Sequence, residues 1–380
     1  MNIGIFTCNY APLINGLSSS IEIFSRSFRA RGHQVFIFAP AYPGYRETEE
    51  GVFRFPSLRV PTHHQYTLPL PLSPKIKALL PRLQLDVLHA QHPFLLGSFA
   101  LHAAQRLHLP LAFTHHTLYE EYAHYVAILP GLAQRLAIRR SVSFANQADL
   151  VIAPTRGLRD ILRQRGVRSR IEVVPTGVEL EGEGQGGIDP SELGIPGSGK
   201  ILLSVGRLAK EKNLEALLEA FSRLAAESPD FYLVLVGKGD EEDRLKAWVR
   251  QRGLAARVRF AGAQPRRDLA RYYRAAHLLL FSSLSEAQGL VVVESMARGL
   301  PVVALRSFAV EDLIEDGVNG YLVEGVEDFV ARARELLFDE TKRRSFSEKA
   351  REKAREFAAP AMAERMLGLY QELVEARKGS

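Results

Sequence analysis

The chain of 380 residues and 42.3 kDa is 46% hydrophobic and 24% charged, which is typical of globular proteins and excludes a disordered, fibrous or low-complexity chain. Its length predicts two domains, and its single cysteine, Cys8, excludes a disulfide framework and a cysteine-based zinc site and favours a reducing cytosol. The net charge of +6 is uneven: residues 1–175 carry 19 Lys and Arg against 10 Asp and Glu, the rest 30 against 33, and a basic half indicates an anionic partner such as nucleic acid, a membrane or a phosphate-bearing substrate.

Short apolar runs alternate with amphipathic stretches in the first half, the pattern of a parallel sheet covered by helices. The run at residues 3–6 has no basic stretch before it, so we interpret it as a buried first strand rather than a secretion signal. No apolar run approaches the roughly 18 residues of a membrane-spanning helix, and a cytoplasmic protein is expected. A helix is predicted at residues 19–31. The predicted strands are 2–7, 34–39, 86–90, 111–114, 149–153 and 171–174.

Two segments that follow predicted strands are candidates for ligand binding. Gly16 lies in a predicted loop, where the absence of a side chain would admit a pyrophosphate; such a glycine can also be a simple turn. The polar run at residues 114–125, THHTLYEEYAHY, predicts an acceptor pocket. The chain has no cysteine near these histidines, no helical His-x3-His and no Asp-x-Asp, so no metal site is predicted. The candidates in this run are His116, Tyr119, Glu120, Tyr122 and His124.

Two segments of the first half mix basic and apolar residues at helical spacing. One carries Lys75 and Lys77, and the other carries Arg135, Arg139 and Arg140. Helices of this kind can lie on an anionic bilayer, and each basic residue near the surface contributes about 1 kcal/mol. The alternative is that each is an ordinary helix with one face packed inward and a solvated charged face.

Residues 179–199 contain seven glycines and two prolines and are interpreted as a linker. It would separate an N-terminal domain of residues 1–178 from a C-terminal domain of residues 200–359, and a final amphipathic helix over residues 360–380 must dock on one of them. Two doubly wound domains would leave a cleft, with ligands beyond the carboxyl ends of the strands. The strands predicted in the second domain are 201–205, 231–236, 258–260, 277–282 and 301–304.

The second domain holds the strongest motifs. Arg207 and Lys212 follow its first predicted strand, and two fixed cations there can clamp a leaving diphosphate. Glu286 and Glu294 stand eight residues apart around a helix start at Gly289 and Leu290, where free backbone N–H groups favour phosphate and the carboxylates can accept from sugar hydroxyls. Taken singly, these segments can also be a solvated basic turn and an acidic helix N-terminus.

Together, the Glu-x7-Glu segment, the Gly-Arg-x4-Lys loop and the early Asn-Gly resemble retaining nucleotide-sugar glycosyltransferases of family 4, which have the two-domain GT-B fold. The segments HHTLYEEYAHY (115–125), HPFLLG (92–97) and ADLVIAPT (148–155) are similar to bacterial diacylglycerol glucosyltransferases. The resemblance implies an α/β fold with two Rossmann-like doubly wound domains and a C-terminal helix that crosses back to the first domain.

The resemblance also implies roles for individual residues. Glu294 would bind the donor ribose and Glu286 would lie against the donor sugar. Arg207 and Lys212 would hold the diphosphate, with Gly16 beside it. His116 would sit near the sugar and the acceptor.

The implied activity is retaining transfer of a hexose, glucose or a related sugar, from a UDP-sugar to a membrane lipid such as diacylglycerol, without a metal or cofactor. The protein would then be peripheral on the inner face of the cell membrane. Two alternatives remain: a glycosyltransferase with a soluble acceptor, a sugar phosphate or glycan, and a GT-B-like sugar-nucleotide epimerase or nucleotide-binding module. Nucleic acid is not expected as a partner, because the basic half has no recognisable reader motif.

Overall fold

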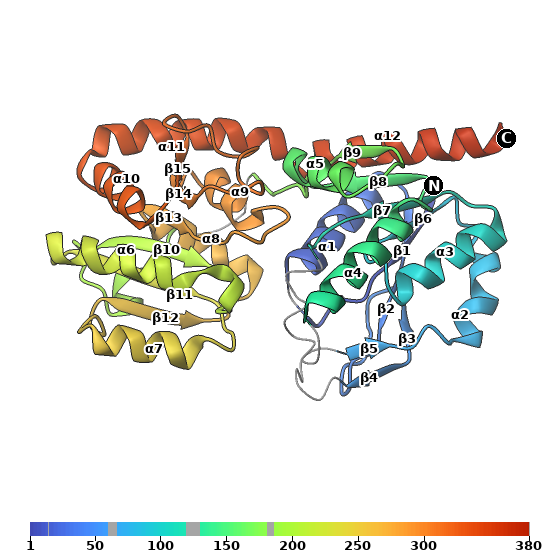
Figure 1. The fold of residues 1–380 in the computed structure, drawn as a ribbon, viewed down its shortest axis with the longest axis horizontal. Coiled ribbons are helices and arrows are strands. Elements are labelled where there is room, and N and C mark those ends of the chain that lie inside the picture. The colour runs from blue at the N-terminus through green and yellow to red at the C-terminus, as the bar shows by residue number, and fades with distance from the viewer. Residues whose placement is uncertain (14, 60–66, 119–129, 181–185, 380) are drawn as a thin grey trace. The chain divides into compact units, whose positions relative to one another are not determined.

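The computed structural model describes residues 1–13, 15–59, 67–118, 130–180 and 186–379 (Figure 1). The chain forms two compact units: unit 1 comprises Met1–Gly177 and Ala359–Ser380, and unit 2 comprises Val178–Ala358. Each unit is built on a parallel sheet with helices packed against it. Within the described ranges, no helix is long and apolar enough to cross a membrane.

The sheet of unit 1 has seven parallel strands in the order β3-β2-β1-β6-β7-β8-β9. The short runs predicted from the sequence form six of these strands, and β3 was not predicted. A separate antiparallel pair is formed by β4 and β5. The strands are β1 (Asn2–Phe6), β2 (Gln34–Pro40), β3 (Val52–Phe55), β4 (Ser57–Arg59), β5 (Thr67–Pro69), β6 (Val87–Ala90), β7 (Leu111–Thr114), β8 (Leu150–Ala153) and β9 (Ile171–Val173).

Local sequence sets where the helices of unit 1 begin. The α1 helix starts at Gly16, three residues earlier than predicted, because Asn15 caps it: the Asn15 carboxamide oxygen accepts from the Ser18 backbone N–H, and the Ser18 hydroxyl oxygen accepts from the Asn15 N–H, both at 2.9 Å. The helices are α1 (Gly16–Arg29), α2 (Pro74–Leu79), α3 (Leu96–Leu107), α4 (Pro130–Ala145), α5 (Arg156–Gln164) and α12 (Ala359–Lys378), and a 3-10 turn spans Leu80–Leu83.

The sheet of unit 2 has six parallel strands in the order β12-β11-β10-β13-β14-β15, of which β15 was not predicted. The strands are β10 (Lys200–Val205), β11 (Phe231–Val236), β12 (Val258–Gly262), β13 (Leu278–Phe281), β14 (Val302–Leu305) and β15 (Gly320–Val323). The helices are α6 (Leu214–Glu227), α7 (Glu242–Gln251), α8 (Arg266–Ala275), α9 (Leu290–Ala297), α10 (Val326–Phe338) and α11 (Glu340–Ala354), with 3-10 turns at Pro190–Leu193, Lys210–Lys212 and Arg355–Phe357.

The interpretation of residues 179–199 as a linker is wrong for residues 186–199. Ile188 and Ile195 are buried in a core cluster of unit 2, and the Ile188 backbone N–H donates to the carbonyl oxygen of Arg271 at 3.0 Å. Asp189 caps the 3-10 turn at Pro190–Leu193. The glycines and prolines of this segment therefore shape an ordered turn, and its two isoleucines supply the apolar surface that fixes it to unit 2.

The C-terminal helix α12 packs on unit 1, as the resemblance implied (Figure 1). Its Ala363, Met366 and Tyr370 are buried in the cluster that also contains Ile3 of β1 and Phe28 of α1. The final segment thus returns to the first domain because its apolar face completes that domain's core.

Replacing Tyr370 by Phe is expected to destabilise the protein by about 1–3 kcal/mol. The Tyr370 hydroxyl and His89 Nδ1 are hydrogen-bonded at 2.5 Å, and both side chains are buried, so the variant leaves a polar nitrogen without its partner. Urea unfolding measures the loss. Tyr232→Phe is the control, because among the described residues the Tyr232 hydroxyl has no hydrogen-bonding partner. An equal effect of the two variants would contradict this account.

Candidate active site

The predicted donor-binding residues of unit 2 follow the two strands at which the strand order changes direction. From β10 the order runs through β11 to β12 on one side and through β13 to β15 on the other. Ligands of doubly wound sheets bind beyond the carboxyl ends of such strands. Arg207 and Lys212 follow β10, and Glu286 follows β13. The topology therefore brings these three residues to the edge of the sheet where a ligand is expected.

The two predicted phosphate-binding cations are each paired with a carboxylate. The Arg207 guanidinium pairs with Glu211, and the Lys212 ammonium pairs with Glu286. The sequence motifs did not identify Glu211, although its i,i+4 spacing from Arg207 was a signal. The Glu211 side chain is only 6% exposed, so it holds Arg207 from within the protein. One pocket is lined by Ser204, Gly206, Arg207, Lys212, Ser282, Ser283 and Glu286, among others.

Serine hydroxyls join the loop after β13 to the loop after β10. The Ser282 hydroxyl donates to the Lys212 carbonyl oxygen at 2.8 Å, and the Ser283 and Ser285 hydroxyls donate to the Glu211 carbonyl oxygen at 3.4 and 3.3 Å. A Cβ at Gly237, after β11, would lie 1.8 Å from the Gly206 carbonyl oxygen, so only glycine permits this close approach. The backbone that carries the two cations is thus fixed from both sides.

Glu294 is held by two residues of α8 that sequence reasoning missed. Its carboxylate accepts from the Arg266 guanidinium at 2.9 Å and from the Tyr273 hydroxyl at 3.1 Å. Glu294 lies within α9, which begins at Leu290 directly after Gly289. A Cβ at Gly289 would lie 3.1 Å from a methyl carbon of Val310, which explains why a small residue stands at this helix start. No sequence periodicity links α8 to α9, so these partners become visible only in the fold.

Gly16 of unit 1 is the first residue of α1, whereas the sequence analysis placed it in a loop. A Cβ there would meet no atom within 4 Å among the described residues outside its own turn of α1. The protein's own packing therefore does not require glycine at this position, and the space beside Gly16 is open at a helix N-terminus, where backbone N–H groups favour an anion.

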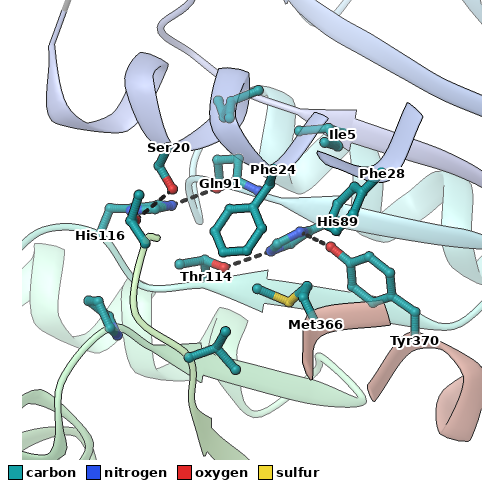
Figure 2. A pocket seen from close by; sticks show the side chains of 14 residues that line it. Ile5, Ser20, Phe24, Phe28, His89, Gln91, Thr114, His116, Met366 and Tyr370 are labelled. Carbon is teal, nitrogen blue, oxygen red and sulfur yellow. Dashed lines mark hydrogen bonds between the residues drawn. The ribbon is translucent and has the colours of Figure 1, made fainter. Parts of the chain in front are cut away.

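His116 lies just beyond β7 and contacts Gln91, which lies just beyond β6. Its Nε2 is 2.6 Å from the Gln91 side-chain oxygen (Figure 2). Both residues line a small cavity together with His89, Thr114 and Tyr370. Burial lowers the pKa of His116 well below 6.5, and the neighbouring His92, His89 and His115 lower it further. The His116 imidazole is therefore neutral at physiological pH.

The buried His89 and His115 predict a loss of stability in acid. Burial lowers the pKa of each imidazole to about 3, against about 6.5 in an unfolded chain. Between these values the unfolded chain binds more protons, so the free energy of unfolding falls as pH decreases from about 6.5, by up to ~1.4 kcal/mol per pH unit for each histidine. Urea unfolding at pH 7 and pH 5 should show a smaller decrease for His115→Gln than for the wild type; identical decreases would refute this.

The residues proposed for the acceptor and membrane fall into two groups. Tyr119, Glu120, Tyr122 and His124 lie outside the described residues. The five basic residues, Lys75 and Lys77 of α2 and Arg135, Arg139 and Arg140 of α4, are all exposed.

Two family models match the chain: "Glycosyltransferase Family 4" over residues 14–181 and "Glycosyl transferases group 1" over residues 188–353. An alpha-monoglucosyldiacylglycerol synthase of Streptococcus pneumoniae is 33% identical over 349 residues, which cover 89% of this chain and 78% of that protein. The chain belongs to glycosyltransferase family 4. A second alpha-monoglucosyldiacylglycerol synthase, from Acholeplasma laidlawii, is 26% identical and covers 99% of this chain and 98% of its own length.

Other relatives of this family 4 glycosyltransferase carry names with a different sugar. The GDP-mannose-dependent alpha-mannosyltransferase of Corynebacterium glutamicum is 27% identical, over 98% of this chain and 89% of that protein. Family membership therefore establishes glycosyl transfer, while the relatives differ in the sugar that their names give.

Solved structures share the fold. Sucrose-phosphate synthase from Thermosynechococcus elongatus superposes with a TM-score of 0.84 at 22% identity, covering 99% of both chains. Anabaena Alr3699/HepE in complex with UDP superposes with a TM-score of 0.80 at 21% identity, covering 98% of this chain and 100% of that one. The fold of this family 4 enzyme is GT-B, as the sequence resemblance implied.

Proposed function

We propose that this family 4 enzyme transfers a hexose, glucose or a related sugar, from a UDP-sugar to a membrane lipid such as diacylglycerol, with retention of anomeric configuration and without a metal ion. The observation that carries the proposal is the exposed face of α4, on which leucines and arginines stand together. The names of two relatives, both alpha-monoglucosyldiacylglycerol synthases, favour the same acceptor.

The donor side of the proposal rests on the charges of unit 2. Arg207 and Lys212 share one pocket, and a diphosphate bound there would exchange their carboxylate partners for phosphate oxygens. Glu286 would be released from Lys212 to accept from a sugar hydroxyl. Glu294, already oriented by Arg266 and Tyr273, would accept from the ribose hydroxyls.

In the proposed reaction, the bond between the anomeric carbon and the diphosphate oxygen breaks, and its electron pair leaves with that oxygen. Arg207 and Lys212 stabilise the charge that develops there. The acceptor hydroxyl oxygen bonds to the anomeric carbon from the same face, and its proton passes to the departing phosphate oxygen. No side chain of the protein needs to act as a nucleophile.

The acceptor side rests on the outer face of α4. Leu132 and Leu136 are 63% and 52% exposed and stand one helical turn apart. Arg135, Arg139 and Arg140 are exposed on the same side of the helix, because positions three, four, seven and eight residues after Leu132 share a face. Apolar side chains among arginines match the interface of an anionic bilayer, where leucine enters the acyl region and arginine binds lipid phosphate.

A second surface of unit 1 has the same character. Leu58 of β4 and Leu68 of β5 are opposite each other in the antiparallel pair, and both are exposed. Leu72, between β5 and α2, is 78% exposed, and Lys75 and Lys77 follow it. Six of the nine large hydrophobic side chains that are exposed in the described ranges belong to unit 1, the basic half of the chain.

The proposal is tested by supplying labelled UDP-glucose, UDP-galactose and GDP-mannose, each with diacylglycerol in anionic vesicles or with soluble sugar phosphates, in the presence and absence of EDTA. We expect label in the organic phase with a UDP-sugar, unaffected by EDTA. Transfer only to a soluble acceptor would overturn the lipid assignment. A soluble acceptor of this kind stands in the name of another relative, the D-inositol 3-phosphate glycosyltransferase of Nocardiopsis dassonvillei. Consumption of donor without any acceptor product would favour an epimerase.

A further inference from the structure

The contact between Gln91 and His116 decides which nitrogen of the His116 ring carries the proton. The Gln91 side-chain oxygen stands 2.6 Å from Nε2 of His116 (Figure 2). An amide oxygen only accepts hydrogen bonds, so with the Gln91 oxygen facing the ring this contact is a hydrogen bond when Nε2 carries the hydrogen. In a neutral imidazole, Nδ1 then has the free electron pair and is an acceptor.

Gln91 is well placed to impose this choice. Its side chain is buried, and its backbone N–H donates to the Phe6 carbonyl oxygen of β1 at 2.8 Å. The backbone of Gln91 is thus tied to β1, the neighbour of β6 in the sheet, and its side chain is enclosed by the protein.

The groups around His116 leave it neutral. The other titratable groups that act on its ring are His89, His92 and His115. His92 Nδ1 accepts from the Cys8 backbone N–H at 3.3 Å, and His115 Nε2 is 2.8 Å from the Ser141 hydroxyl. Burial and these three neighbouring histidines all disfavour the imidazolium form of His116.

Nδ1 of His116 is left available. Among the described residues it has no hydrogen-bonding partner, and it is not one of the side-chain atoms that are buried without one. The His116 side chain is half-buried, and its Nδ1 is the ring nitrogen that does not face Gln91.

We propose that Gln91 is a positioning residue that holds His116 as the Nε2–H tautomer, so that Nδ1 accepts a hydrogen bond from a hydroxyl of the transferred sugar or the acceptor. The role of Nδ1 toward substrate rests on the proposed function. The tautomer itself does not, and it can be measured on the protein without substrate.

The test is the tautomer of His116, measured by NMR on protein with ¹⁵N-labelled histidine, with His116→Gln identifying its signals. We expect the Nε2–H form between pH 6 and pH 8 in the wild type and a mixture of tautomers in Gln91→Leu. Thr176→Val is the control. Thr176 is another buried residue that lines the same cavity, and its hydroxyl donates to the Ser20 hydroxyl. The Nδ1–H form in the wild type, or an unchanged tautomer in Gln91→Leu, would overturn the proposal.

Kinetics supply the second measurement. Gln91→Leu should lower kcat about tenfold, the effect of losing one hydrogen bond to substrate, in protein that thermal unfolding shows to be folded at the assay temperature. In Gln91→Glu the carboxylate should raise the pKa of His116. A protonated ring has no nitrogen that can accept a hydrogen bond, so the activity of this variant should fall as pH decreases toward 6. The activity of the wild type should stay constant over the same range. A flat profile for Gln91→Glu together with wild-type kcat for Gln91→Leu would contradict the role of Nδ1. Absence of transfer by the wild type would instead contradict the proposed function and leave the tautomer result standing.

Discussion

Replacing Lys212 by alanine is expected to lower kcat by about a hundredfold or more, which corresponds to ~3 kcal/mol of transition-state stabilisation. The same is expected for Arg207→Ala. Both cations lie in the pocket after β10 and β13, and both would act mainly when the departing diphosphate develops its charge. Steady-state kinetics with saturating donor measures the change.

Lys210→Ala is the matched control for this prediction. Lys210 lies two residues before Lys212, and its exposed side chain does not line the pocket. Lys210→Ala removes the same charge, so its kcat should stay near that of the wild type. Thermal unfolding of each variant separates a folding defect from a catalytic one. Folded Lys212→Ala with kcat within threefold of the wild type would refute the role assigned to this residue.

Removing the three arginines of the α4 face together, Arg135, Arg139 and Arg140 to glutamine, is expected to weaken binding to anionic vesicles about a hundredfold, because each contributes about 1 kcal/mol near a charged surface. Sedimentation with vesicles at low salt measures this. Binding of the wild type should weaken as salt rises.

A control variant removes three exposed basic residues of unit 2, Arg250, Arg344 and Lys349, and changes the net charge equally. It should bind vesicles like the wild type. The apolar part of the face is tested separately by Leu132→Ser with Leu136→Ser, compared with Leu284→Ser, which is 51% exposed in unit 2. Equal binding of the triple variant and the control, or equal binding to neutral vesicles, would contradict the membrane surface.

The sheets were predictable because their strands are short, buried on both faces and almost uninterruptedly apolar. The prediction for β11, residues 231–236, has the observed bounds, and β7, residues 111–114, does also. Four strands were missed, β3, β4, β5 and β15. Of these, β3 contains an arginine, Arg54, that pairs with Glu47. A charged residue in a strand is tolerated where a partner exists, and the partner cannot be read from the strand itself.

The apparent linker misled for a related reason. Its glycine and proline content is that of a flexible segment, but Ile188 and Ile195 have a place in the unit 2 core. The glycine and proline content of a segment does not reveal one or two apolar side chains that pack into the core. Whether the segment is ordered depends on the burial of those side chains.

In the candidate site, the motifs predicted Arg207, Lys212 and Glu286. These residues follow β10 and β13, where the strand order changes direction, so the topology of the sheet brings them together. The residues that orient them came only from the structure. Arg266 and Tyr273 beside Glu294, and Gln91 beside His116, make contacts between segments that are distant in the sequence and share no period. A motif predicts the group that meets the ligand, and the fold identifies the groups that hold that residue in place.

The most direct measurement is the NMR spectrum of the lipid product formed from UDP-glucose and diacylglycerol in anionic vesicles. The account predicts a glucosyl-diacylglycerol whose anomeric configuration is that of the donor, formed by the wild type and nearly absent with Lys212→Ala. A glycolipid of inverted configuration, or no glycolipid from any UDP-sugar, would contradict it.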